Sequence, residues 1–121
     1  PGNGAGSFAT PIQAGTGWGH LEELTGGDFN SDGNADIAAR RKADGALIIY
    51  PGNGVGSFNA AVSAGTGWGI MRDIFSGDLN GDGRTDVTAV QAPQGAAGNM
   101  YLYPGTGQHT FAGRVTIGTG W

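Results

Sequence analysis

A period of about 50 residues constrains the fold of this chain more than any other feature of its sequence. The segment 1–8 (PGNGAGSF) returns as 51–58 (PGNGVGSF) and more loosely as 104–111. A second segment, 14–19 (AGTGWG), returns as 64–69 and again as 117–121 (IGTGW). The spacing of the first segment is 50 residues and then 53, with the extra residues in the stretch 92–99. A fixed period of this length is typical of repeat architectures, in which each unit buries its apolar face against its neighbours.

Short apolar runs rich in β-branched and aromatic residues lie between the glycine-rich turns. They predict strands at 21–24, 37–40, 46–50, 58–62, 70–75, 87–90, 100–103 and 111–117. Asp44-Gly45 predicts a hairpin turn, and no segment keeps a helical period. Four short strands in a period near 50 predict an all-β chain of β-propeller-type blades. The predicted units are a partial unit at 1–18, blade 1 at 19–68 and blade 2 at 69–121.

The number of units raises the question of how such a chain closes. Propellers contain roughly four to eight blades, whereas this chain supplies two full repeats and an extra half-unit. A lone pair of blades would expose apolar surface and strand edges. We therefore expect closure only by oligomerisation, as a homo-oligomer, or as part of a longer array. The surplus half-unit could supply an extra strand to a neighbouring sheet.

Each full unit carries the same acidic loop. Residues 28–36 (DFNSDGNAD) and 78–86 (DLNGDGRTD) both fit D-x-N-x-D-G-x-x-D, and they hold six of the ten acidic residues. Oxygen ligands at alternate positions, bent back by Gly33 or Gly83, suit a hard divalent cation. Two copies in phase predict two structural Ca²⁺ ions per chain. An EF-hand needs helices and a bidentate Glu at position twelve, where this chain has Ala39 and Ala89.

Composition argues against several other functions. The formal charge is −4 with only six Lys and Arg, which disfavours nucleic-acid binding. The basic run 40–42 is interpreted as a solvated strand end. Cysteine is absent, and no apolar run is long enough to span a membrane. His20 and His109 are isolated and the common nucleophile, zinc and phosphate motifs are missing, so we expect no catalysis.

The tryptophans Trp18, Trp68 and Trp121 recur in Gly-Thr-Gly-Trp segments and leave two interpretations open. Repeated aromatics commonly wedge between blades, and a large aromatic side chain is generally buried. Alternatively, the flanking glycines could let a ligand reach the indole. We favour packing and keep these residues as candidate ligand contacts.

With these motifs in place, the chain resembles the FG-GAP or VCBS repeats, the calcium-binding blades of integrin-α-type propellers. The sequences of its motifs are most similar to those of repeats in secreted actinobacterial proteins. Such repeats often lie beside hydrolase domains. The resemblance implies a seven-bladed propeller with Ca²⁺ in the hairpin between the first two strands of a blade. The ligands it implies are Asp28, Asn30, Asp32, Asp36 and the Asn34 carbonyl in one loop, and Asp78, Asn80, Asp82, Asp86 and the Arg84 carbonyl in the other.

The resemblance also sets the functional expectation. It implies a secreted, non-catalytic interaction module with an accessory or adhesive role, whose ligand is a carbohydrate or a protein. The alternative is a multivalent carbohydrate-binding lectin that uses the repeated Gly-Thr-Gly-Trp segments.

Overall fold

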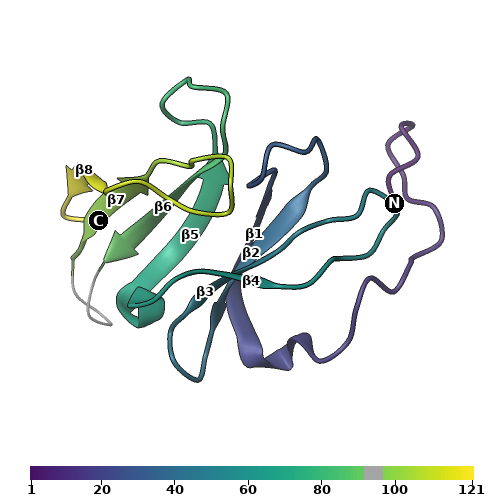
Figure 1. The fold of residues 1–121 in the computed structure, drawn as a ribbon, viewed down its shortest axis with the longest axis horizontal. Coiled ribbons are helices and arrows are strands. Elements are labelled where there is room, and N and C mark those ends of the chain that lie inside the picture. The colour runs from purple at the N-terminus through teal and green to yellow at the C-terminus, as the bar shows by residue number, and fades with distance from the viewer. Residues whose placement is uncertain (92–96) are drawn as a thin grey trace.

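Over residues 1–91 and 97–121, which the computed structural model describes, the chain forms two four-stranded antiparallel sheets that do not close into a ring (Figure 1). In each sheet the strands lie side by side in sequence order. Sheet 1 contains β1 (Leu21–Gly27), β2 (Asp36–Arg41), β3 (Leu47–Tyr50) and β4 (Val62–Gly65). Sheet 2 contains β5 (Met71–Gly77), β6 (Asp86–Gln91), β7 (Asn99–Tyr103) and β8 (Val115–Thr119). The predicted all-β, blade-type fold class is confirmed.

The last strand of each sheet begins later than the sequence predicts. The predicted strands 58–62 and 111–117 correspond to β4 at Val62–Gly65 and β8 at Val115–Thr119. Phe58 and Phe111 instead form isolated bridges with Gly52 and Gly105, which close the proline-glycine loop before the chain returns to its sheet. The predicted boundaries at 58 and 111 are therefore wrong, because an aromatic in a loop closure has the same local signature as a strand residue.

Two short 3₁₀ turns precede the sheets, and the sequence patterns did not predict them. In the described residues η1 (Trp18–His20) leads into β1 and η2 (Trp68–Ile70) leads into β5. The predicted strand start at Ile70 therefore falls inside η2. Most of the stretch 92–99, to which the sequence assigned the extra residues of the second period, lies outside the described residues.

The first strand of each sheet carries a bulge at the same place. The register against the second strand shifts between Glu22 and Thr25 in sheet 1, and between Arg72 and Phe75 in sheet 2. Inside each bulge lies an acidic residue with a positive φ, 52° at Glu23 and 53° at Asp73, a conformation uncommon outside glycine. Such bulges bend a strand and redirect its side chains.

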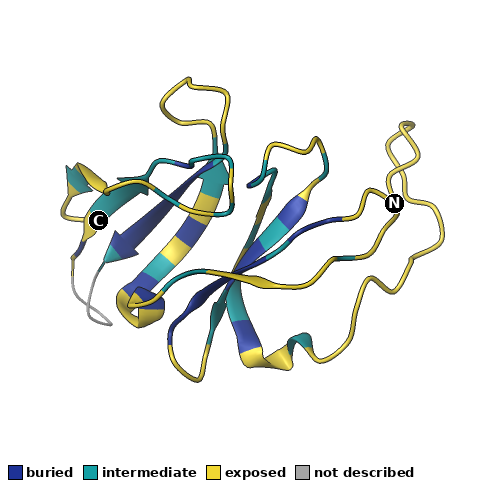
Figure 2. Cartoon of the chain, in the orientation of Figure 1, coloured by how far each residue is buried: buried dark blue, intermediate teal, exposed yellow. Residues whose placement is uncertain are grey.

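The hydrophobic core lies between the two sheets. Its buried members come from both of them: Phe29, Ala38, Leu47, Ile49, Trp68, Met71, Ile74, Val87 and Ala89. Strands β1 and β5 contact each other directly, and the inner strands β2, β3 and β6 are the most deeply buried (Figures 1 and 2). Residues 1–17 are exposed throughout. In the described part of the chain, no helix has the length and apolar character needed to cross a membrane.

Candidate functional site

The two acidic loops connect the first and second strands of their sheets and share one hydrogen-bond pattern. The Asp28 carboxylate accepts the backbone N–H groups of Asp32 (3.1 Å) and Gly33 (2.9 Å). Asp78 accepts the equivalent groups of Asp82 and Gly83 at the same distances. The position-six glycines provide the predicted bend, with φ of 85° at Gly33 and 83° at Gly83. The first carboxylate of each loop therefore sits over the loop's own backbone.

The side chains at the third and fifth positions of each loop also accept backbone N–H groups of the loop. Asn30 Oδ1 accepts the Asp32 N–H at 3.0 Å, and Asp32 Oδ1 accepts the Asn34 N–H at 2.8 Å. The Asn34 N–H, followed by the Asn30 amide, lowers the pKa of Asp32 below its usual value. Asn80 and Asp82 make the same bonds at 2.9 Å each. Three oxygen-bearing side chains are thus drawn together in each loop.

The ninth-position carboxylates lie elsewhere, in the buried base of the loop. Asp36 Oδ2 accepts the Phe29 N–H at 2.9 Å, and Oδ1 accepts the Gly52 N–H at 2.8 Å. Asp86 accepts the N–H groups of Leu79, Asn80 and Gly105. Both carboxylates are at most 1% exposed. Each one ties the acidic loop to the proline-glycine turn of its own sheet.

The close contact between loop and turn explains two of the glycines. A Cβ on Gly52 would lie 2.1 Å from the Ala35 carbonyl oxygen, and a Cβ on Gly105 would lie 2.1 Å from that of Thr85. Only a residue without a side chain lets the turn come this close. The repeated Pro-Gly motif is therefore part of the loop's support.

The oxygen atoms of the acidic loops match the ligands that a hard cation needs at some positions and not at others. Within residues 1–91 and 97–121, no three His, Cys, Asp or Glu side chains are grouped so as to hold a metal. Asp28, Asn30 and Asp32 offer the carboxylate and amide oxygens that Ca²⁺ prefers. Both carboxylate oxygens of Asp36 already accept buried backbone N–H groups. Each oxygen keeps a second acceptor site that could contact an ion. At the seventh position the Asn34 side chain lies against Gly54, and Arg84 Nη1 lies 3.9 Å from Asp82 Oδ2.

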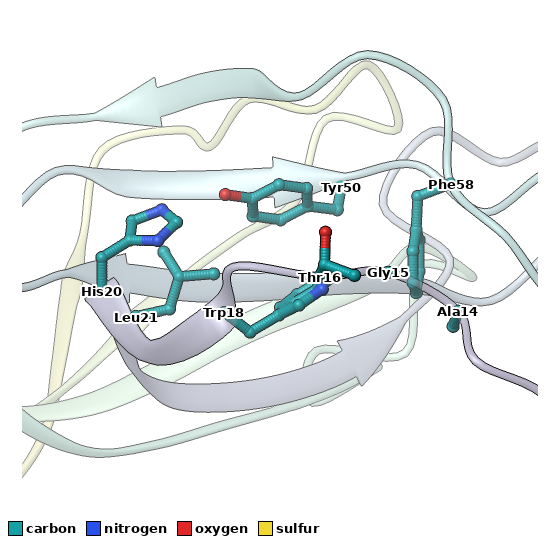
Figure 3. A pocket seen from close by; sticks show the side chains of 8 residues that line it. All are labelled: Ala14, Gly15, Thr16, Trp18, His20, Leu21, Tyr50 and Phe58. Atoms are coloured by element: carbon teal, nitrogen blue, oxygen red, sulfur yellow. The ribbon is translucent and has the colours of Figure 1, made fainter.

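The tryptophans occupy three different environments. Trp18 is half-buried in an open pocket of about 200 Å³ on sheet 1, with Tyr50 (ring centroids 4.7 Å apart) and Phe58 (5.4 Å). Figure 3 shows the Tyr50 ring above Trp18, with Phe58 and His20 at the two ends of the pocket. Sequence reasoning did not place Tyr50, Phe58 or His20 there.

Trp68 and Trp121 are the repeat equivalents of Trp18. Trp68 is 5% exposed and packs on Tyr103 (4.5 Å) and Phe111 (6.5 Å), the equivalents of Tyr50 and Phe58. Trp121 is 57% exposed. The backbone holds both in the same way, because the Trp68 N–H donates to the Gly45 carbonyl and the Trp121 N–H donates to that of Gly98.

Arg40 is a residue whose role the sequence interpretation missed. Its side chain is only 13% exposed, so its assignment to a solvated strand end is wrong. The guanidinium pairs with Glu22 at 2.9 Å and donates to the backbone carbonyls of Trp68, Gly69 and Met71. It therefore fastens sheet 1 to the start of sheet 2. A single arginine carries no periodic signal, so the sequence offered no way to find it.

Comparison with known proteins gives one match. The family profile described as "FG-GAP-like repeat" matches residues 28–89, from the first acidic loop to the strand after the second. No curated protein and no solved structure matches the chain. The matched segment is 62 of the 121 residues, more than half of the chain, and it contains both acidic loops. The chain therefore belongs to the FG-GAP-like repeat family.

Proposed function

We propose that this chain is a calcium-stabilised, non-catalytic interaction module that works outside the cell. The observation that carries the proposal is the duplication of one loop geometry, in which the first, third and fifth side chains make the same backbone bonds in both sheets. Repeats of this family are generally structural or interaction modules. Duplication of a polar loop in phase with the fold also favours a structural role.

In this proposal one Ca²⁺ binds each loop. Asp28, Asn30, Asp32 and the Asn34 carbonyl would hold the first ion, and Asp78, Asn80, Asp82 and the Arg84 carbonyl the second. Asp36 and Asp86 would add a ligand through their second acceptor sites while keeping the loop tied to the turn. The ion would neutralise carboxylates that otherwise repel each other in a short loop. Calcium is plentiful outside cells, where modules with modest affinity are saturated.

Thermal unfolding tests the calcium site. Saturation at about 100 times the dissociation constant adds about 2.7 kcal/mol to the free energy of unfolding per site. We expect calcium to raise the melting temperature by about 10 °C for each occupied site and a chelator to reverse the shift. Asp28→Asn should reduce the calcium response, whereas Asp44→Asn, which removes one charge outside the loops, should preserve it. Identical melting curves with calcium and with chelator would contradict the proposal.

A second candidate function, carbohydrate binding, has its own observation in the Trp18 pocket. The pocket presents Trp18, Tyr50 and Phe58 around an open volume of about 200 Å³, and its lining residues carry no carboxylate and no Lys or Arg. An aromatic face beside backbone and hydroxyl groups suits the apolar face and hydroxyls of a pyranose.

A glycan array tests this second function. We expect binding by the unaltered chain and its loss in Trp18→Ala. Phe8→Ala, which removes an exposed aromatic outside the pocket, serves as the matched control and should bind normally. Failure to bind any glycan, or equal binding by Trp18→Ala, would remove the lectin function and leave the calcium proposal untouched.

A further inference from the structure

Two surfaces of the chain carry repeat copies of the residues that join its two sheets. We call the surface of sheet 1 around Trp18, Leu24 and Phe58 the head face. The surface of sheet 2 around Phe75, Leu79 and Trp121 is the tail face. When the two repeats are aligned in sequence, the head face of sheet 1 corresponds to the side of sheet 2 that packs on sheet 1. The tail face is equivalent to the side of sheet 1 that packs on sheet 2.

Exposure shows that both faces lack the cover that their equivalents have. Ile74 is 7% exposed at the contact between the sheets, whereas its equivalent Leu24 on the head face is 50% exposed. Phe29 is 3% exposed at that contact, whereas its equivalent Leu79 on the tail face is 49% exposed. In each pair both residues are large and apolar, and the buried one has the neighbouring sheet against it. Figure 2 shows the loop that follows β5 exposed at its tip.

Two contacts between the sheets can be carried over to a contact between a tail face and a head face, whereas the Arg40 contact cannot, because its repeat equivalent is Val90. Inside the chain, the Phe29 ring meets Phe111 edge to face at 6.2 Å. Carried over, Leu79 would meet Phe58. Inside the chain, the Thr25 hydroxyl bonds to Ser76 at 2.8 Å. In the contact between two copies, Phe75 would replace Thr25 and Gly26 would replace Ser76. The larger side chain of Phe75 is then offset by the absence of a side chain at Gly26.

We propose that the chain associates with further copies of itself, the tail face of one copy packing on the head face of the next. The occupant is a second copy because the free faces repeat a contact that the chain already makes within itself. The interface is heterologous, so it generates either a ring or an open array. With two sheets per copy, a ring of about two to four copies would hold the roughly four to eight sheets that propellers contain.

The two ends of the chain would compete for one position in this contact. Segments 14–18 and 117–121 are repeat copies, so Trp121 of one copy would approach the place that Trp18 of the next copy holds. Residues 1–17 are exposed throughout, and no strand includes them in this fully described part of the chain. We expect this N-terminal segment to move aside. An added copy would also cover the Trp18 pocket, so glycan binding and self-association exclude each other at the head face.

Sedimentation velocity over a range of concentrations, with saturating calcium, tests the proposal. We expect the mean mass to rise above 12.1 kDa with concentration. Leu79→Asp on the tail face and Leu24→Asp on the head face should each weaken association by about tenfold or more. Val55→Asp is the matched control. Val55 is 79% exposed, and its repeat equivalent Gln108 is exposed as well, so its substitution should leave the mass unchanged.

Mixing the two variants identifies the geometry. Each keeps one intact face, and an equimolar mixture should form a 1:1 pair of the tail face of Leu24→Asp with the head face of Leu79→Asp. A monomer at every concentration would overturn the proposal, as would association that both variants leave unchanged or that mixing does not partly restore. Circular dichroism confirms that each variant is folded. Calcium binding is read separately from the melting curve, so failure of one proposal is distinguishable from failure of the other.

Discussion

Trp18 and Trp68 hold the same position in successive repeats, and their surroundings differ in one respect. Each packs on a tyrosine of the third strand and on the phenylalanine that closes the proline-glycine loop. Trp68 also has sheet 1 against it and is buried, whereas Trp18 has no sheet in that place within residues 1–91 and 97–121 and lines an open pocket. Burial of a residue in this fold therefore depends on the adjacent unit as much as on its own sheet, as expected of repeat proteins.

The acidic loops show the same dependence on the neighbouring sheet. The first loop lies against sheet 2, where the Phe29 carbonyl accepts the His109 N–H at 3.0 Å. Phe29 is buried, and Asp28 is half-buried. The second loop has the same internal bonds, yet Leu79 and Asp78 are exposed. Internal loop geometry is thus set within a sheet, and loop burial is set between sheets.

Replacement of the two tryptophans gives the largest expected effect. Trp68→Ala should reduce the free energy of unfolding by about 3–5 kcal/mol, because it empties a site in the core. Trp18→Ala should reduce it by less than half as much, since its indole is partly in solvent. Urea unfolding measures both values. Equal losses would show that the adjacent sheet does not decide the difference.

Removal of the buried ninth-position charges ranks next. Asp86→Asn should cost about 2–3 kcal/mol, because an amide cannot accept all the backbone N–H groups that the carboxylate now satisfies. Asp36→Asn, with two such bonds against three, should cost somewhat less. Unfolding in chelator isolates this effect from ion binding. If both variants unfold like the parent chain in chelator, these carboxylates do not hold the loop and turn together.

The sequence predicts those features that recur with the period. The strand pairs around the acidic loops, the bend at Gly33 and Gly83 and the all-β class each depend on residues that occur twice in phase. The starts of β4 and β8 were wrong because Phe58 and Phe111 serve a loop closure. The prediction that Arg40 lies at a solvated strand end was wrong because its side chain makes contacts between the two units. Its repeat equivalent is Val90, so no periodic pattern marks this role. The local sequence pattern therefore predicts the strands and turns of one unit. It does not predict the tertiary contacts between units.

Arg40 gives a test of what joins the sheets. Arg40→Met keeps the apolar stem and removes the donors to the carbonyls of Trp68, Gly69 and Met71. We expect a loss of about 1–2 kcal/mol in the free energy of unfolding. Glu22→Gln keeps those donors and should cost less, since its carboxylate is 40% exposed. A loss in Glu22→Gln as large as in Arg40→Met would assign the effect to the ion pair instead of the carbonyl contacts.

The smallest expected effect concerns the hairpin between β2 and β3, where the two sheets differ again. Arg41 holds Asp44 in sheet 1 through bonds of 2.9 and 2.6 Å, while sheet 2 has Gln91 in place of Arg41. The Arg41 guanidinium, followed by the Ala46 N–H, lowers the pKa of Asp44 to about 2. Because the folded pKa lies below the unfolded value of 3.8, this pair stabilises the fold above about pH 4 and ceases to do so as the pH falls through about 2. In an NMR titration, Arg41→Gln should return the pKa of Asp44 toward 3.8, whereas Lys42→Gln should leave it low. A low pKa that persists in Arg41→Gln would show that the turn's backbone alone holds the carboxylate.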